Sequence, residues 1–444
     1  MVALVGAIIS ISAGEATADG VVVSNASPRS IGRAGAGTVS DDGAGALLLD
    51  PAVLARRDSW RMQLGIAWVD DSVSWQEPGG EPTARDQAGS RAVPTVALEG
   101  GVGGFVLAIG ATTSAVASRS LRQPGALDPA SYGGAFDYRY DGYAGTLRRD
   151  TLSIGAARRL GDAVAVGVAL AASRVSAGET RALWAGFTGR SDAIGDPAHD
   201  VTVAASGTDD FSPSAIAGVF VAPPDTRVEL AASIGWAATA HVSGGASALG
   251  STDVSAKTQS ATAALDLREP ITVRTGARYL EKRWILELDG DLWIFPTSAE
   301  SASWSLGGVS VVDESGASVA LTGLPSRISE RTHGAVRAAV DVQIIEGYLW
   351  ATAGYAYTTA NTDAARRSVT FSDLATHTLG LGLEASAGNF TITLGWSRTW
   401  AIAEGDPTTA WSLDNPFHAG TAAIDWGTFD QSSDLAGIGI DAEL

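Results

Sequence analysis

The sequence predicts an all-β protein, a transmembrane antiparallel β-barrel of about 14 strands with an N-terminal hatch plugging the lumen. Three features predict it: a glycine- and alanine-rich N-terminal stretch, apolar residues that alternate with polar or small ones, and connections that alternate in length. Of the 444 residues, 45% are hydrophobic and 18% are charged, whereas soluble proteins average about 25% charged residues. Beyond the first few positions, the apolar residues form no run of about 20, as a transmembrane helix would require.

The composition also limits which cellular compartment and which binding partners are compatible with the chain. The chain has no cysteine, which excludes a disulfide scaffold and a thiolate metal site. A net charge of -19 argues against nucleic acid, whose phosphates need cations. Val2 to Ile11 is an apolar stretch before Ala16-Thr17-Ala18, a pattern typical of an export signal with its cleavage site. The expected basic residues are missing, since the first Lys or Arg is Arg29. We therefore expect a signal peptide at 1–18, a hatch at 19–57 and a barrel at 58–444.

The hatch is predicted from the stretch between Ser24 and Ala55. It carries too many glycines for a long helix. It is also a poor strand, because Pro51 follows its most apolar run, Leu47-Leu48-Leu49. The turn Asp50-Pro51-Ala52 ends the run, and the short Asp50 side chain can bond the local backbone. A compact segment ahead of a long series of strands is best interpreted as a plug inside the barrel that those strands build.

The stretch from Trp60 to Trp68 shows the strand pattern most clearly. Trp60, Met62, Leu64, Ile66 and Trp68 alternate with polar or small residues and so share one face of a strand. Eight residues span roughly 26 Å, or about 20 Å of height when the strand is tilted by some 40°. This approximates the roughly 25 Å apolar band between the aromatic girdles of a membrane barrel. We therefore predict a lipid-facing strand.

The same pattern recurs along the chain, and the connections show which end of the barrel each strand reaches. Short turns alternate with long loops rich in Gly, Ser, Asp and Pro, as in outer-membrane barrels. We predict strands at 58–70, 92–99, 104–118, 150–159, 162–175, 211–222, 226–242, 268–280, 282–298, 327–345, 347–359, 375–387, 389–401 and 429–443. We predict long loops at 71–91, 119–149, 176–210, 243–267, 299–326, 360–374 and 402–428.

Charged residues are expected on the inner face of three neighbouring strands. By parity, arginines on one strand face carboxylates on the next across a tight turn. One interpretation is a charge ladder that keeps the lumen wet and anchors the plug. The other is that Arg331, Arg274 or Arg337 binds the acidic headgroup of a ligand bidentately. The lumen residues predicted in this way are Arg274, Arg278, Glu287, Asp289, Asp291, Arg331 and Arg337.

The N-terminal stretch resembles, in order and spacing, the start of the FadL family of outer-membrane transporters for hydrophobic compounds. That family opens with a Gly/Ala-rich hatch ending in an Asn-Pro-Ala turn, and Asp50 replaces the Asn here. Leu324-Pro325-Ser326-Arg327-Ile328-Ser329-Glu330-Arg331 also resembles the family's segment entering a late strand. The resemblance implies fourteen strands and passive uptake of fatty acids or aromatic hydrocarbons across a Gram-negative outer membrane, by hatch movement and lateral exit through an early strand.

Two further site predictions concern the hatch and, as the resemblance implies, an early strand. Leu47, Leu48 and Leu49 are the candidate apolar ligand surface, although packing of the hatch against the wall explains them equally well. The strand at 104–118 would carry the lateral opening. Gly110 breaks its middle and is the candidate kink, although a small residue facing the lumen explains it equally well.

The outer loops offer weaker signals. Their aromatic residues could form a landing groove for a hydrophobic ligand or pack the loops together. The acidic stretch 192–210 matches no calcium loop, so we predict no metal site and no cofactor. The five histidines lie in no catalytic pattern, and we predict that the protein is not an enzyme. The aromatic loop residues are Trp184, Phe187, Trp304, Trp411 and Phe417.

The expected partners are a hydrophobic small molecule, outer-membrane lipid and lipopolysaccharide, with the protein as a monomer. Two alternatives stay open, a polar-solute porin and a structural or adhesive barrel. A porin would need a wide, unplugged lumen, and an adhesive barrel would use its loops and bind no small molecule.

Overall fold

The fold is taken from a computed structural model of the chain. Because residues 1–26 lie outside the described part, the signal peptide predicted at 1–18 and the first residues of the predicted hatch do too. The described residues are 27–76, 83–86, 88–121, 137–140, 142–186, 196–295, 302–312, 316–326, 328, 331–361, 368, 370–371, 374–401, 411–412, 423–424 and 427–444.

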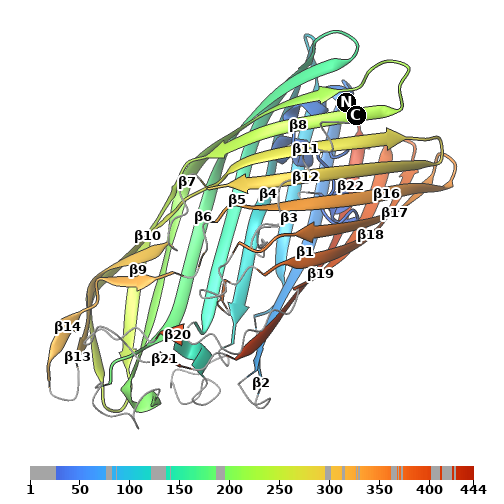
Figure 1. The fold of residues 1–444 in the computed structure, drawn as a ribbon. Coiled ribbons are helices and arrows are strands. Elements are labelled where there is room, and N and C mark those ends of the chain that lie inside the picture. Colours follow the sequence, from blue (N-terminus) through green and yellow to red (C-terminus); the bar gives the residue numbers. More distant parts are fainter. Residues whose placement is uncertain are drawn as a thin grey trace.

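Within the described part of the chain, 14 antiparallel strands close into a barrel (Figure 1). Closure is made by the first and last strands, which pair along all 16 residues of β1, from Arg61 opposite Glu443 to Gln76 opposite Thr428. Each predicted range overlaps one strand of the ring, so the predicted barrel is confirmed. In order around the ring, the strands are β1 (Arg61–Gln76), β3 (Arg91–Val102), β4 (Phe105–Ser120), β5 (Ala144–Arg159), β6 (Val164–Trp184), β7 (Asp200–Val221), β8 (Val228–Ala237), β11 (Ile271–Leu280), β12 (Trp284–Ile294), β16 (His333–Ile345), β17 (Leu349–Thr358), β18 (Thr376–Ala387), β19 (Phe390–Ala401) and β22 (Thr428–Glu443).

The two faces of the wall differ as strand alternation requires. Trp60 and Trp68 are 45% and 46% exposed on the outer face, as the sequence predicts. Leucines at 286 and 288 on β12 are likewise exposed, while Glu287 and Asp289 between them are buried. Apolar side chains therefore cover the outside and polar ones line the inside. No described helix is long and apolar enough to cross a membrane.

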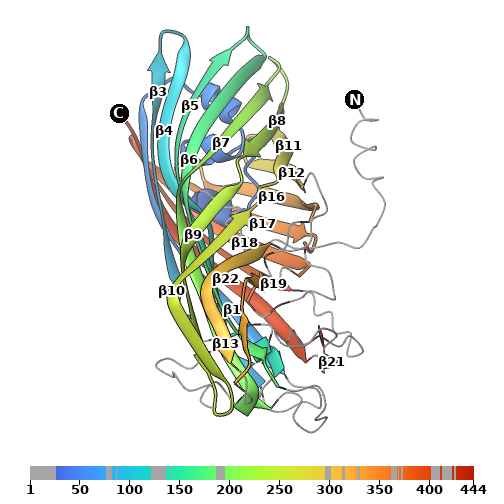
Figure 2. The ribbon, with the colours of Figure 1, turned by 90° about the vertical axis from the view of Figure 1, so that its left-hand side faces the viewer.

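A second group of strands extends the barrel at its long-loop end, beyond the ends of β8 and β11 (Figures 1 and 2). The first part of β7, residues 201–208, pairs with β9, whereas residues 214–221 pair with β8. β9 pairs with β10, and β10 pairs with β13. The extra strands are β9 (Ala240–Gly250), β10 (Ser255–Leu267), β13 (Ser303–Val312), β14 (Ser318–Ala320) and β15 (Gly323–Pro325).

These strands correct three predicted loops. Residues 176–210 contain the ends of the long strands β6 and β7, and 243–267 and 299–326 contain the extra strands. They cover a large apolar cluster around Trp304 and Val311, both fully buried, which explains why the chain stays in strands past the barrel rim. The remaining short elements are β2 (Thr83–Arg85), η3 (Asp137–Tyr140), η5 (Pro197–His199), β20 (Trp411–Ser412) and β21 (Ala423–Ile424).

Candidate functional site

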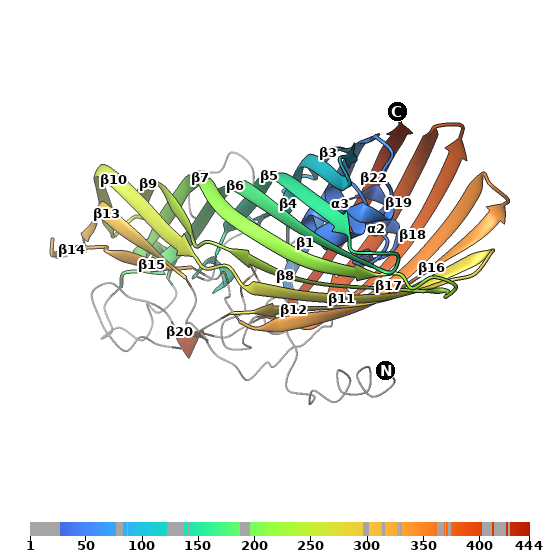
Figure 3. The same cartoon turned by 90° about the horizontal axis from the view of Figure 1, so that it is seen from above.

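Residues 27–57, called here the inner segment, lie within the ring of strands (Figure 3). Three short helices make up most of the inner segment. Ser27 and Ser30 form a capping box, each side chain accepting from the other's backbone N–H, and Pro28 takes the first helical position. Helices this short are not stable alone, so the wall must hold them in place. They are α2 (Pro28–Gly32), α3 (Ala44–Leu48) and η1 (Pro51–Arg56).

One side of the inner segment is held by two carboxylates on β12. Asp289 Oδ2 accepts hydrogen bonds from the backbone N–H groups of Gly37 and Thr38, at 2.7 and 2.9 Å. Glu287 Oε1 accepts from those of Val39 and Ser40, at 3.0 and 3.1 Å. Hydrogen bonds from backbone N–H groups to a charged acceptor are stronger than neutral ones. Two predicted lumen residues therefore fix four consecutive amides of the inner segment.

Arginines complete this contact. Arg33 of the inner segment pairs with Glu287 and with Asp341 of β16, and the Arg33 and Glu287 side chains are each only 1% exposed. Arg56, at the end of η1, pairs with Glu229 of β8 at 2.7 Å. Buried charges are tolerated only when paired in this way.

The wall arginines also pair with carboxylates. Arg278 lies 3.3 Å from Glu229 and 4.0 Å from Glu287. Arg337 contacts Asp291, and Arg274 lies 4.0 Å from the same carboxylate. We call the whole cluster the charged belt. It comprises Arg33, Arg56, Arg274, Arg278, Arg337, Glu229, Glu287, Asp289, Asp291 and Asp341.

A second polar contact lies across the barrel, on β1 and β3. Glu99 Oε2 accepts from Gly43 N at 3.0 Å, and Gln63 Oε1 accepts from Ala44 N at 3.2 Å. Arg61 bonds Glu99 through Nε at 2.9 Å. These bonds satisfy N–H groups at the start of α3, which no side chain of the inner segment caps.

The neighbouring strands β17 to β19 and β22 hold the inner segment mainly by shape, beside the Arg29–Glu384 ion pair at 3.2 Å. The backbone of residues 28–34 lies against glycines of the wall, leaving no room for side chains there. A Cβ on Gly380 would come within 2.7 Å of Gly32 O and 2.8 Å of Ile31 O, and one on Gly437 within 2.8 Å of Ile31 Cδ1. Only glycine permits this approach. We call these positions the glycine wall, which comprises Gly354, Gly380, Gly382, Gly395, Gly437 and Gly439.

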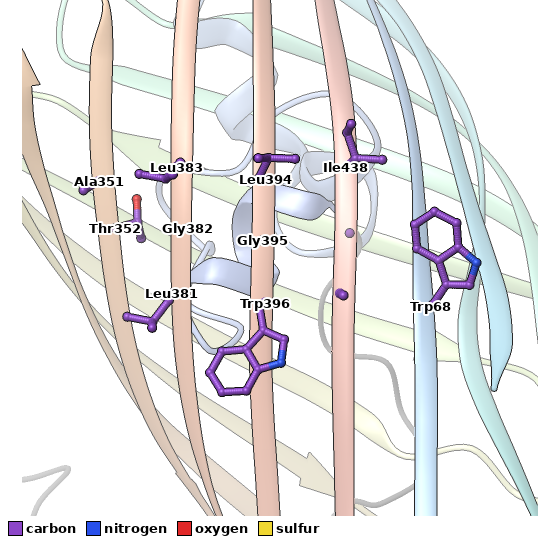
Figure 4. A pocket seen from close by; sticks show the side chains of 12 residues that line it. Trp68, Ala351, Thr352, Leu381, Gly382, Leu383, Leu394, Gly395, Trp396 and Ile438 are labelled. Atoms are coloured by element: carbon purple, nitrogen blue, oxygen red, sulfur yellow. The ribbon is translucent and has the colours of Figure 1, made fainter. Parts of the chain in front are cut away.

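The outer face of the same strands carries an apolar groove of about 650 Å³ (Figure 4). Trp68, Ala436 and Trp396 form one cross-strand row, with the alanine between the two indoles. Leu394 and Ile438 lie in the next row. Only the strand backbone therefore separates this groove from α2 on the inner face.

The three leucines of the predicted ligand surface are not equivalent. Leu47 is 1% exposed and lies against β4 and β5, where its methyl groups approach Gly110 and Gly155. Leu49 is also buried, and its carbonyl accepts a hydrogen bond from the Ser233 hydroxyl of β8. Leu48 is half-buried. Leu47 and Leu49 therefore pack the inner segment against the wall, and Leu48 presents the most surface.

The turn Asp50-Pro51-Ala52 begins η1. Asp50 Oδ1 accepts from Ala52 N at 2.9 Å, and Pro51 is the first helical residue. The carboxylate is fully buried against Gly218, where a side chain would overlap Oδ1. Burial raises the pKa of Asp50 to about 7, while the helix-cap bond and the charge of Arg274 act in the opposite direction.

Two predicted positions differ from expectation. β4 keeps its register through Gly110, opposite Ala97 and Ser153, and its register shift lies between Thr113 and Ala115. Arg331 precedes β16 and is exposed, because that strand begins at His333 rather than at 327. Arg331 therefore lies outside the strand to which it was assigned, and the register shift of β4 lies beyond the predicted kink at Gly110.

Several anchoring residues were not among the predicted site residues. Arg33 is the only cation within the stretch Gly32 to Leu49, a signal that could have identified it. Glu99 and Glu229 lie near strand ends, where parity alone does not show whether a side chain faces the lumen or the rim.

At the long-loop end, aromatic residues pack inward. Trp184 and Trp304 are fully buried, so neither contributes an exposed landing surface. Trp75 and Tyr143 contact Tyr138 edge-on, with ring centroids 5.3 and 6.4 Å away. Phe187, Phe417 and Asp192 of the acidic stretch lie outside the described residues. Among the residues that the structure describes, no cluster of three or more His, Cys, Asp or Glu side chains could hold a metal ion.

Similar proteins are found by structure and not by sequence. No protein-family profile and no curated protein matches the sequence. The structure resembles a Pseudomonas aeruginosa FadL homologue with a TM-score of 0.71 and 15% identity, over 96% of this chain and 99% of that one. It resembles the P. putida toluene transporter TodX with a TM-score of 0.64 and 13% identity, over 94% and 97%.

The Ralstonia pickettii toluene transporter TbuX gives a TM-score of 0.64 at 14% identity, over 94% of this chain and 98% of that one. At such identities the likeness concerns the fold. The chain therefore has the FadL-type barrel fold that its sequence resemblance predicts.

Proposed function

We propose that this protein is an outer-membrane transporter for the passive uptake of hydrophobic small molecules, with the inner segment as its hatch. The apolar outer face supports a membrane location, because such a surface is unstable in water. The structurally similar proteins include two toluene transporters and CymD, a monoaromatic hydrocarbon channel. The expected state is a monomer in contact with membrane lipid and lipopolysaccharide.

One observation carries the proposal: the inner segment is attached to the wall only through its chain and through non-covalent contacts. The hydrogen bonds from the inner segment to Glu287, Asp289, Glu99 and Gln63 can break and form again. The glycine contacts depend on shape alone. A ligand that binds against Leu48 could therefore shift the inner segment without breaking the ring.

The proposed route begins with capture at the outer loops and continues to the apolar stretch beside the hatch. After hatch movement, the ligand leaves sideways into the bilayer, where an apolar solute dissolves. We place the lateral opening on β4. The register shift between Thr113 and Ala115 supports this choice of strand, because irregular pairing weakens a ladder locally.

The test is displacement of a fluorescent apolar probe from the purified barrel. Wild type is compared with Leu48→Asp, which places a charge on the apolar stretch, and with Leu48→Met, which keeps that stretch apolar. We expect saturable binding that Leu48→Asp loses and Leu48→Met retains. Binding that is absent from wild type, or that Leu48→Asp leaves unchanged, would contradict the proposed site.

The same preparation separates the two alternatives. A polar-solute porin would show a large single-channel conductance that deletion of residues 27–57 leaves unchanged. An adhesive barrel would bind no probe and would lose its adhesion when the strands β9, β10 and β13 are shortened. A transporter with a seated hatch should give low conductance that rises when the inner segment is removed.

A further inference from the structure

The arginines of the charged belt all have carboxylate partners. The belt contains five arginines and five carboxylates, and each arginine lies within 4.0 Å of at least one of those carboxylates. The Arg337–Asp291 pair is shielded from water, since its side chains are 4% and 6% exposed. An additional carboxylate entering the belt would lose its hydration and find every belt arginine already paired, which is strongly unfavourable.

The belt lies beside the proposed ligand surface. Ser233, whose hydroxyl donates to Leu49 O, is the direct cross-strand partner of Arg274. The next residue after Leu49 is Asp50, which adds one more carboxylate on this side and senses the charge of Arg274. A polar end placed beside Leu49 and Ser233 would therefore meet arginines that are already paired and the additional carboxylate of Asp50.

Asp291 is the carboxylate that Arg274 and Arg337 share. It contacts Arg337 and lies 4.0 Å from Arg274. Without this carboxylate, the belt would gain one positive charge, and two guanidinium groups would face a common space. Paired guanidinium groups are a strong binding site for a carboxylate.

We infer that this transporter selects hydrophobic ligands with an uncharged end, such as hydrocarbons, alcohols or esters, and that Asp291 enforces the selection by holding Arg274 and Arg337. The inference rests on the proposed function. It decides between the two roles that the sequence leaves open for these arginines, in favour of anchoring and against binding an acidic headgroup.

The test uses three ligands of one chain length, dodecan-1-ol, methyl dodecanoate and dodecanoate, displacing the same apolar probe at pH 8. The acid is ionised at this pH. We expect the alcohol and the ester to displace the probe at concentrations at least about tenfold lower than the acid. Asp291→Asn should lower the concentration of the acid needed for displacement about tenfold and leave that of the alcohol unchanged.

The matched control is Asp210→Asn, the same chemical change at a carboxylate on β7 that is 80% exposed and paired with Arg174. This variant should change displacement of the probe by neither the acid nor the alcohol. An acid that displaces the probe as well as the alcohol from wild type would overturn the inference while leaving the transporter intact, and this comparison requires no variant. Equal changes for acid and alcohol in Asp291→Asn would overturn the role of Asp291. If no ligand displaces the probe, the proposed function itself fails.

Discussion

The two sides of the barrel hold the inner segment in different ways. On β8, β11, β12 and β16 the contact is made by charge, with four backbone amides and two arginines of the inner segment bound to wall carboxylates. On β17 to β19 and β22 it is made mainly by shape, with the backbone of α2 against the glycine wall beside the Arg29–Glu384 ion pair at 3.2 Å. Protonation or a charged ligand can weaken the charged contacts, whereas the glycine contacts are weakened only by added side-chain volume. The two sides can therefore be perturbed separately.

The largest effect is expected on the charged side. Arg33→Met should weaken the seating of the inner segment by about 3–5 kcal/mol, because Glu287 and Asp341 would be left buried without their partner. Since the chain has no cysteine, a single cysteine at the fully buried Ala36 reports seating through its rate of maleimide labelling. That rate should rise strongly in Arg33→Met.

The control for this experiment is Arg398→Met, which removes an arginine that is 53% exposed and 3.6 Å from Asp434. Exposed pairs contribute about 0–1 kcal/mol, so the labelling rate at position 36 should hardly change. Equal rates in the two variants would show that the charged belt does not hold the inner segment.

An intermediate effect is expected on the glycine side. Gly380→Ala places a methyl group against the carbonyl oxygens of Gly32 and Ile31, and overpacking of this kind costs about 1–3 kcal/mol. Gly290→Ala on β12 is the matched control, because its nearest contact would be Thr275 Oγ1 at 3.6 Å. Labelling at position 36 should rise for Gly380→Ala only. The shape argument would be refuted by indistinguishable rates.

A graded effect concerns pH and Asp50. Its pKa is raised by burial from 3.8 to about 7, so the neutral acid is favoured when the inner segment is seated. The contribution of Asp50 to seating is therefore fully present below about pH 4 and is lost as the pH rises toward 7, by at most about 1.4 kcal/mol per pH unit. Asp50→Asn, which restores the amide of the family turn, removes this dependence.

The measurement is the ratio of labelling rates at position 36, wild type over Asp50→Asn, because the ratio cancels the pH dependence of the thiol itself. It should climb by up to about tenfold per unit between pH 4 and 7 and then level off. A flat ratio over this range would mean that Asp50 is ionised even when buried.

Sequence reasoning reached the barrel because its signal is local. Alternation along Trp60 to Trp68 and the short turn after Leu280 depend on neighbouring residues only. The extra strands β9, β10 and β13 escaped it, because a run such as Ser243 to Gly250 is too rich in glycine, serine and alanine to show alternation. Those strands form through pairing with β7 and through the apolar cluster around Trp304, which are long-range contacts.

In the site, too, some residues follow from a local sequence pattern and others do not. The parity that places Glu287 and Asp289 inside the barrel follows from the strand pattern, so both were predicted. Their partners, the amides of residues 37–40, lie about 250 positions earlier in the chain, and no local pattern connects the two. Arg331 was misplaced because strand ends are the least certain part of any such prediction.

The closure of the ring has a consequence for assembly. β1 begins only four residues after the inner segment, and its pairing with β22 completes the barrel. Because the inner segment contacts strands around the whole circumference, it must already be inside when the first and last strands meet, or else enter through an end afterwards. The inner segment thus favours a ring of the correct number of strands. In a ring with one strand too many or too few, it would lose either the carboxylate contacts or the glycine contacts.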